Sequence, residues 1–213
     1  MKKILLIFIA ILCEMTCFAQ LPTENLFLWL SADSVEIASG TTNRVSRMYD
    51  KSGNNNSFTQ SNSTYRPTLV NSSFLNKNVV SFNGSNQYIV GSFPTPLDMP
   101  YLIFIMWNSS RSNTSTQMIF SLNNVNYFFD SGTTNNQVRL CGSLVYNKTY
   151  PITNYILTTG IVNGSSSYLY ENLTYKATGS INNINNTTSC NIGRLFVESG
   201  TSSRYFEGNM FKL

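Results

Sequence analysis

The sequence contains no histidine among its 213 residues. Ser-His-Asp hydrolases and Cys-His enzymes use an imidazole to take the proton of the nucleophile, so both classes are excluded. The commonest protein ligand of zinc and iron is missing as well. No glycine-rich phosphate loop opens a predicted helix, which argues against nucleotide chemistry of the P-loop type.

Charge is also scarce. Charged residues are 11% of the chain, against about a quarter in soluble proteins generally. The arginines are scattered and form no basic run, so the charge does not predict nucleic-acid binding. Aromatic residues reach 13%, and Asn, Ser and Thr are abundant. This composition favours strands and turns over helices and is unlike that of disordered chains.

The chain begins with a short apolar run. Lys2 and Lys3 precede the run Ile4–Leu12, and small residues lie near Ala19. The run is too short for a membrane-spanning helix, and the pattern predicts a signal peptide over residues 1–19. We therefore expect a secreted or cell-surface protein with one domain over residues 20–213 and no transmembrane segment in the mature chain.

Cysteine is sparse. Of four cysteines, the predicted signal removes two, and Cys141 and Cys190 remain in the mature chain. Export permits a Cys141–Cys190 disulfide. Two buried free thiols are the alternative, because nothing in the sequence shows that their strands are neighbours.

The mature chain shows short strand patterns separated by turn residues, and no window has a helical period. Asn83-Gly84 predicts a hairpin between two of the strands, and Asn163-Gly164 marks a second such turn. The pattern indicates an all-β sandwich or barrel. The predicted strands cover residues 26–30, 79–82, 87–90, 101–107, 117–122, 126–129, 137–141, 155–162, 167–170, 191–193 and 205–213.

Four segments carry a family resemblance. They are LFLWLSADSV (26–35), MYDKSGNNNSFTQ (48–60) with RPTLV (66–70), NVVSFNGSNQYI (78–89), and NIGR (191–194) with YFEGNM (205–210). In this order they resemble the laminin-G-like domains of the concanavalin A-like lectin/glucanase superfamily, in the form found in secreted bacterial proteins. The resemblance implies a jelly roll of two antiparallel sheets, usually without catalysis, that binds glycans or proteins and sometimes carries calcium.

The chain departs from that family at two places. Tyr49 stands where the family often has tryptophan. The family's last strand normally continues through a further segment, whereas this sequence stops at Leu213. We therefore expect the domain to be clipped at its C-terminal end.

Glycoside hydrolysis is the enzymatic alternative, because the same superfamily contains glucanases. It generally needs two carboxylates about 5 to 10 Å apart, and in a strand residues i and i+2 point to one face. No two acids of the mature chain are spaced i, i+2 or i, i+4, and the closest pair is Asp33 and Glu36. We therefore expect a protein that is not an enzyme.

Sugar sites combine aromatic rings with polar groups that bind hydroxyls. Phe27 and Trp29 lie in an apolar run and are predicted to belong to the core. Candidate ligand-binding residues are those next to polar loops: Tyr65, Trp107, Tyr146 and Tyr150. For Trp107, core packing is the competing interpretation.

The loop DKSGNNNSFTQ (50–60) is rich in amide and hydroxyl side chains and contains one acid, Asp50. Asp50, Asn54 and Asn56 supply oxygen atoms of the kind that calcium binds. Asp130, before Ser131-Gly132, is a second calcium candidate. Turn formation is the alternative, with Asp50 capping the turn and Gly53 at positive φ. We expect the Phe58 side chain to pack in the core and to hold the loop in place.

These observations lead to two functional hypotheses. The first is recognition of a carbohydrate polymer or surface glycan, or adhesion, at the cell surface. The second is a structural or adhesive module that binds a protein partner. Nucleic acid is not expected as a partner, and calcium is the one cofactor that the sequence suggests.

Overall fold

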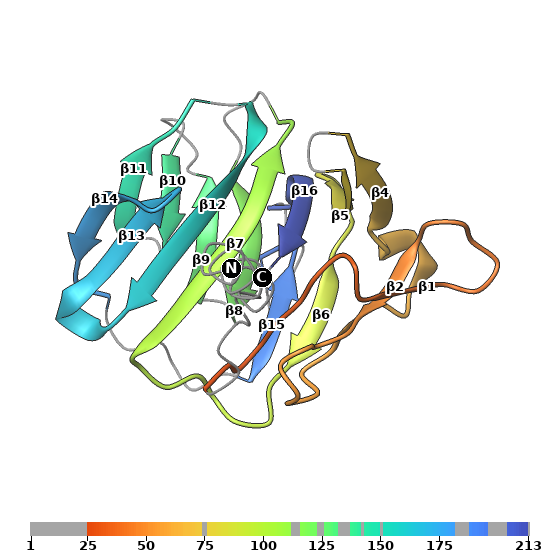
Figure 1. Ribbon diagram of the computed structural model, residues 1–213, viewed down its shortest axis with the longest axis horizontal. Helices are drawn as coiled ribbons and strands as arrows, with labels where there is room; N and C mark the ends of the chain where they lie inside the picture. Colours follow the sequence, from red (N-terminus) through yellow and green to blue (C-terminus); the bar gives the residue numbers. More distant parts are fainter. Residues whose placement is uncertain are drawn as a thin grey trace, which may run out of the picture.

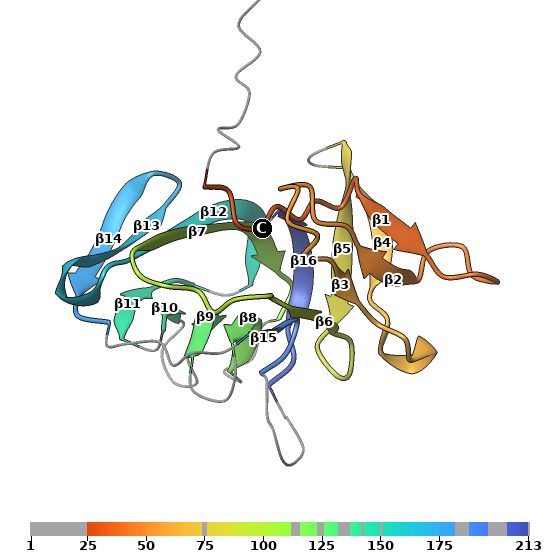
Figure 2. The same cartoon turned by 90° about the horizontal axis from the view of Figure 1, so that it is seen from below.

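The computed structural model describes residues 25–73, 76–111, 116–122, 126–131, 137–141, 143–149, 151–181, 188–195 and 204–212. The predicted signal peptide lies outside this range. Two antiparallel sheets pack face to face as a sandwich (Figures 1 and 2). The prediction of an all-β, two-sheet antiparallel fold is confirmed. Among the described residues, no helix is long and apolar enough to cross a membrane.

One sheet has nine strands, in the order β1 (Val35–Ile37), β2 (Val45–Met48), β3 (Phe58–Thr59), β6 (Ile89–Ser92), β15 (Ser189–Ile192), β8 (Gln117–Leu122), β9 (Asn126–Ser131), β10 (Gln137–Leu140) and β11 (Leu144–Asn147). The other has seven, in the order β14 (Thr174–Gly179), β13 (Ser167–Glu171), β12 (Ile152–Val162), β7 (Tyr101–Ser109), β16 (Glu207–Lys212), β5 (Lys77–Asn83) and β4 (Thr68–Ser72). Two short 3-10 helices, η1 (Ser63–Tyr65) and η2 (Gly164–Ser166), lie in the described part of the chain.

The core lies between the two sheets and contains large aromatic side chains. Phe58, Phe120 and Phe206 are almost completely buried. In β7, Ile105 and Trp107 are buried while Leu102 is exposed, which is the period-two pattern of a strand with one face toward the core. The expected role of Phe58, which anchors the polar loop to the core, is confirmed.

The predicted hairpin at Asn83-Gly84 is wrong. The strand before it, β5, pairs with β4 and β16, whereas the strand after it, β6, pairs with β3 and β15. The turn does form, because Gly84 has φ of 71° and the Asn83 side chain accepts backbone N–H bonds from residues 85–87. It carries the chain from one sheet to the other. The second predicted turn does join paired strands, β12 and β13.

The segment Leu26–Leu30 is not a strand, although its sequence predicts one. It is joined to the seven-stranded sheet at its end by a bridge between Ser31 and Lys212. The strands β1, β2, β3, β4, β11 and β14 are not among the predicted strands. Most of them are short or polar, so the alternation of apolar residues is weak there.

Candidate functional site

The Asp50 carboxylate organises the polar loop through four hydrogen bonds. Its Oδ1 accepts the backbone N–H of Trp29 at 2.9 Å and that of Ser52 at 2.9 Å. Its Oδ2 accepts the Ser52 hydroxyl at 2.8 Å and the Asn56 N–H at 2.9 Å. Gly53 has φ of 95°, as predicted. Asp50 therefore caps the turn and at the same time holds the segment that contains Trp29.

The amides of the same loop bind the same segment. Asn54 Nδ2 donates to the carbonyls of Leu26 at 2.8 Å and Phe27 at 3.1 Å. Asn56 Nδ2 donates to the Phe27 carbonyl at 2.9 Å. These bonds satisfy carbonyl groups that have no ladder partner, since Leu26–Leu30 is not a strand. The loop therefore holds the segment Leu26–Trp29 in place through hydrogen bonds to its backbone.

The calcium hypothesis for this loop competes with these contacts. An ion bound to the Asp50 carboxylate would have to displace hydrogen bonds that both of its oxygens already accept. The turn interpretation therefore describes the observed contacts of Asp50, Asn54 and Asn56. The side chain of Asp130, the other calcium candidate, lies outside the described residues, although its backbone pairs with β8 and β10.

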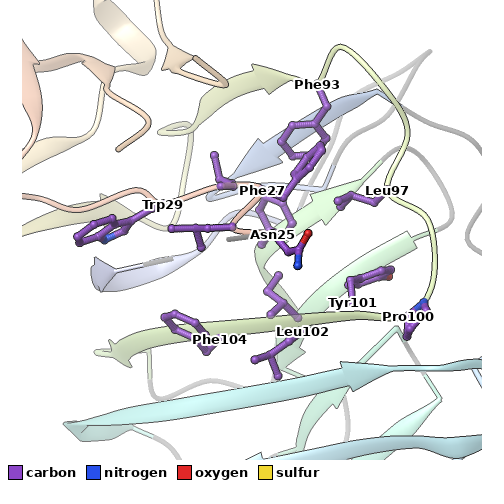
Figure 3. Close-up of a pocket in the computed structure, with 13 residues that line it drawn as sticks. Asn25, Phe27, Trp29, Phe93, Leu97, Pro100, Tyr101, Leu102 and Phe104 are labelled. Carbon is purple, nitrogen blue, oxygen red and sulfur yellow. The ribbon is translucent and has the colours of Figure 1, made fainter. Parts of the chain in front are cut away.

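The segment Leu26–Trp29 forms one wall of a pocket of about 430 Å³ (Figure 3). The opposite wall is the first half of β7, with Tyr101, Leu102 and Phe104, and the connection from β6 to β7 closes one end. Pockets of this size are typical of ligand sites. Its lining residues are Asn25, Leu26, Phe27, Leu28, Trp29, Phe93, Leu97, Pro100, Tyr101, Leu102, Ile103, Phe104 and Phe120.

Among the described residues, those that line the pocket include no Lys, Arg, Asp or Glu. Outside the lining, the ammonium of Lys51 lies 4.5 Å from the ring centroid of Trp29. Phe27 and Phe93 pack edge to face with centroids 4.9 Å apart. Burial raises the pKa of the Tyr101 hydroxyl, so that side chain stays neutral. The pocket is thus an uncharged, largely apolar site.

A second feature lies on the outer face of the seven-stranded sheet. Tyr168 and Tyr170 of β13 and Tyr175 of β14 form a tyrosine patch on strands that lie side by side in Figure 1. The rings of Tyr168 and Tyr170 have centroids 6.4 Å apart, and those of Tyr170 and Tyr175 6.1 Å apart. Tyr168 is 36% exposed and Tyr175 54% exposed, with half-buried Tyr170 between them. Three neighbouring rings are therefore accessible from solvent.

The tyrosine patch faces outward because of strand alternation. Ser167, Leu169 and Glu171 of β13 are buried, so the intervening Tyr168 and Tyr170 point away from the core. On the adjoining strand β12, Thr159 is paired with Tyr170 and Ile161 with Tyr168. The sequence signal for the patch is the alternation SYLYE, but alternation alone does not show which face is left uncovered.

Trp107, a candidate ligand residue, belongs to the core. It is 1% exposed, its Nε1 donates to Thr158 Oγ1 at 2.9 Å, and its ring packs edge to face on Phe206. The core interpretation is correct, and the assignment of Trp107 as a ligand residue is corrected. Trp29, predicted to be core, is half-buried and lines the pocket instead.

Tyr65 is half-buried, and its ring packs beside the ring of Tyr88. The centroids of the Tyr65 and Tyr88 rings are 5.4 Å apart. The guanidinium carbon of Arg194 lies over the Tyr88 ring, 3.4 Å from its centroid. Arg194 and Tyr88 hold each other by cation–π attraction. Tyr65 thus packs on its own protein with one ring face.

Tyr146 is part of an ionic cluster that joins the two sheets. Its hydroxyl donates to Glu171 Oε2 at 2.7 Å, and Lys148 Nζ donates to Glu171 Oε1 at 3.0 Å. Lys176 is a further ion-pair partner at 3.9 Å. Burial raises the pKa of Glu171, but the bonds from Tyr146 and Lys148 outweigh it and the pKa is lowered. Tyr150 lies outside the described residues.

Neither Cys141 nor Cys190 forms a disulfide in the described part of the chain. Cys190 lies in β15, and Cys141 follows β10, three strands away in the order β15-β8-β9-β10. Three strand spacings are about 14 Å, whereas a disulfide needs Cα atoms within about 7 Å. The Cys141–Cys190 disulfide is therefore excluded by the sheet order.

The sequence matches no protein-family model, and a comparison with curated proteins finds no match. Solved structures do resemble the fold. One is domain 4 of AbnA, a GH43 extracellular arabinanase from Geobacillus stearothermophilus in complex with arabinotriose, at 14% identity and TM-score 0.54, covering 87% of this chain and 89% of that one. Another is Trypanosoma rangeli sialidase in complex with the inhibitor DANA, at 10% identity and TM-score 0.54, covering 87% of this chain and 30% of that one. At these identities the likeness shows a shared β-sandwich fold.

Proposed function

We propose that this protein is an exported, non-catalytic module that recognises carbohydrate through the tyrosine patch on β13 and β14. The observation that carries the proposal is the solvent access of three adjacent rings, Tyr168, Tyr170 and Tyr175, on one sheet face. Aromatic rings stack on the apolar faces of sugar rings, and their hydroxyls bind polar groups. The laminin-G-like resemblance and the arabinotriose complex of a domain with the same fold support this proposal.

The surroundings of the patch suit a neutral polymer. The acid of β13, Glu171, is buried and points toward the core side, where it binds Tyr146 and Lys148. The face around the rings carries hydroxyl and aliphatic groups of Thr159 and Ile161. An extended row of rings on adjacent strands fits several sugar units of one chain better than a single sugar.

The proposed absence of catalysis is supported by the partners of the acids. Glu36 binds Tyr49 and Ser46, Glu171 binds Tyr146 and two lysines, and Glu207 binds Arg111. Asp50 binds the polar loop and Trp29 N–H. Each of these carboxylates is held by hydroxyl, amide or basic groups, whereas a glycosidase keeps two carboxylates available for the sugar.

The test is binding of the mature chain to a panel of soluble polysaccharides that includes arabinan, measured by affinity electrophoresis and then by calorimetry with the oligosaccharide that binds. Removing a stacking ring should cost about 1 kcal/mol, so we expect Tyr175→Ala and Tyr170→Ala each to weaken binding several-fold and the double variant to abolish it. Tyr49→Ala removes an exposed ring outside the patch and is the matched control.

Two results would contradict the proposal. One is equal loss of binding in Tyr49→Ala and in the patch variants. The other is release of reducing sugar from any polysaccharide of the panel, which would show catalysis. If the mature chain binds none of the polysaccharides, the result favours the second hypothesis, a module that binds a protein partner.

A further inference from the structure

The sequence contains two Asn-Gly pairs in almost the same local setting. They are Asn83-Gly84 in FNGS (82–85) and Asn163-Gly164 in VNGS (162–165). Both asparagines are exposed, and both glycines have positive φ, 71° at Gly84 and 56° at Gly164. Any difference in the chemistry of the two pairs therefore has to come from their contacts in the fold.

An asparagine followed by glycine carries a reactive pair of groups. The backbone nitrogen of the glycine can attack the side-chain Cγ of the asparagine, because glycine has no Cβ beside that nitrogen and its backbone adapts readily. The nitrogen loses its proton to water and bonds to Cγ, the bond from Cγ to Nδ2 breaks, and Nδ2 takes up a proton and leaves as ammonia. Water then opens the cyclic imide at either carbonyl, which gives aspartate or isoaspartate. Water is the only co-reactant.

At Asn83 both reacting groups are held by hydrogen bonds. Asn83 Oδ1 accepts the backbone N–H groups of residues 85–87 at 3.0, 3.2 and 3.3 Å. Its Nδ2 donates to Asn86 Oδ1 at 2.8 Å. The attacking nitrogen, that of Gly84, donates to the Phe206 carbonyl at 2.9 Å. The amide cannot turn toward the glycine nitrogen until several of these bonds have opened.

At Asn163 neither reacting group is held by the described part of the chain. The Asn163 side chain caps no N–H of η2 and has no other hydrogen-bond partner among the described residues. Gly164 is the first residue of η2, where backbone N–H groups have no partner inside the helix. One bond of the peptide group between the two residues has to open, from Ser166 N–H to the Asn163 carbonyl at 3.0 Å.

We propose that Asn163 is a site of spontaneous deamidation, at which water converts the asparagine to aspartate or isoaspartate, and that Asn83 is protected from the same reaction. The protection comes from the hydrogen bonds of the Asn83 amide and of the Gly84 nitrogen, which have no counterpart at Asn163. Each bond that must open first lowers the population of the reactive geometry. Asn163 should therefore convert at least tenfold faster than Asn83 in the folded protein.

The position of Asn163 gives the modification a structural effect. Its N–H donates to Ser167 Oγ at 3.0 Å, and the Gly164 carbonyl accepts the Ser167 hydroxyl at 2.9 Å and Ile181 N–H at 2.9 Å. These bonds hold the turn from β12 to β13, just before Tyr168 of the tyrosine patch. Isoaspartate adds a methylene group to the main chain and a negative charge, so these bonds cannot all be kept. The isoaspartate form should be less stable than the unchanged protein.

The test compares the two pairs within one protein. Folded protein is incubated in mildly alkaline buffer made with water enriched in heavy oxygen and is then digested. Mass spectrometry follows the peptides that contain Asn83 and Asn163. We expect the Asn163 peptide to lose ammonia and gain heavy oxygen at least tenfold faster than the Asn83 peptide. In urea the two rates should be similar, because both turns are unfolded and their flanking residues are nearly the same.

A variant connects the modification to stability. Asn163→Ala removes the reactive amide at an exposed position, so that peptide should gain no heavy oxygen. The melting temperature of the unchanged protein should fall as the converted fraction grows. The melting temperature of Asn163→Ala should stay constant over the same incubation.

Three outcomes would overturn the proposal. The first is conversion of Asn83 in the folded protein as fast as that of Asn163. The second is an Asn163 that stays intact in the folded protein and converts in urea. The third is a melting temperature that falls equally in the unchanged protein and in Asn163→Ala, which would place the damage elsewhere. Glycan binding by the tyrosine patch is measured separately and decides none of the three.

Discussion

At the scale of single residues, the polar loop shows how a cluster of amide and acidic side chains can serve the chain itself. Asp50, Asn54 and Asn56 bind backbone groups of the segment that lines the pocket. Their polarity first indicates calcium or sugar, but four hydrogen bonds already occupy the carboxylate. The loop acts on the pocket by positioning its wall.

Gly53 offers a direct measure of the loop's contribution to stability. Its φ is 95°, and a Cβ added to this residue would meet no atom within 4 Å, so the backbone conformation and not space restricts the position. Gly53→Val should lower the free energy of unfolding by about 1–2 kcal/mol, the cost of left-handed backbone for a non-glycine residue. Urea unfolding of both proteins measures it.

Gly53→Asn is the matched variant, because asparagine tolerates the left-handed region. Asn55, two residues on, already has φ of 59°. The asparagine variant should lose clearly less stability than the valine variant. Equal losses, or no loss in either, would show that positive φ at this position does not limit the fold.

At the scale of elements, Glu171 links two sheets across one end of the sandwich. It lies on β13 of the seven-stranded sheet, whereas Tyr146 lies on β11 of the nine-stranded sheet and Lys148 directly follows it. Glu171 is 8% exposed, so the loss of its carboxylate leaves buried or half-buried donors without a partner. The cluster thus joins the edge strand β11 to β13, which lies next to the edge strand β14.

This cluster makes stability depend on pH with a definite sign. The pKa of Glu171 is lowered in the folded protein from 4.5, so the cluster stabilises the fold above about pH 4.5 and this contribution is lost as pH falls through the folded pKa. Glu171→Gln should lower the free energy of unfolding by about 2 kcal/mol at pH 7. The difference should shrink at pH 3.

Thermal unfolding of both proteins across this pH range checks the expectation. Glu36, which is also held by hydrogen bonds but is fully exposed, provides the comparison through Glu36→Gln. That variant should change the melting temperature little at either pH. A Glu171→Gln effect that is the same at pH 7 and pH 3 would contradict the assigned ionic role.

The sequence predicts strands with a strong hydrophobic pattern more accurately than strands with a weak one. The strongly apolar β7 and β8 are predicted closely, because few other structures accommodate such runs. The hairpin predicted at Asn83-Gly84 is wrong, because the turn signal is local whereas the pairing of β5 and β6 is decided by the partners each finds in different sheets. Among the described residues, Leu26–Leu30 has no strand beside it to pair with.

At the scale of the whole molecule, sheet order decides what distant residues can do. Cys141 and Cys190 are separated by the strands β8 and β9, and burial raises the pKa of the Cys190 thiol. The sandwich is therefore held by its core and not by a covalent link between these two residues. This distinguishes it from small exported domains that depend on disulfides.

The two cysteines give a prediction for a chain that starts at residue 20. Reducing agent should leave the melting temperature unchanged, and iodoacetamide should label half-buried Cys141 faster than buried Cys190 in the folded state. Mass spectrometry of labelled protein, folded and in urea, provides the measurement. A mass lower by two hydrogens in the unlabelled chain, restored by reductant, would show a disulfide after all.

The sequence by itself determined which kind of secondary structure the protein forms and one class of catalysis that it lacks. Its alternating apolar residues, turn signals and lack of histidine fix an all-β chain without imidazole catalysis, since these depend on residue type and local spacing. Only the tertiary structure decided which faces stay open. The tyrosine patch is exposed because nothing packs on that part of β13 and β14 among the described residues, and the pocket lies where the segment Leu26–Trp29 faces the first half of β7. Both depend on which strands become neighbours, and local sequence carries no information on that choice.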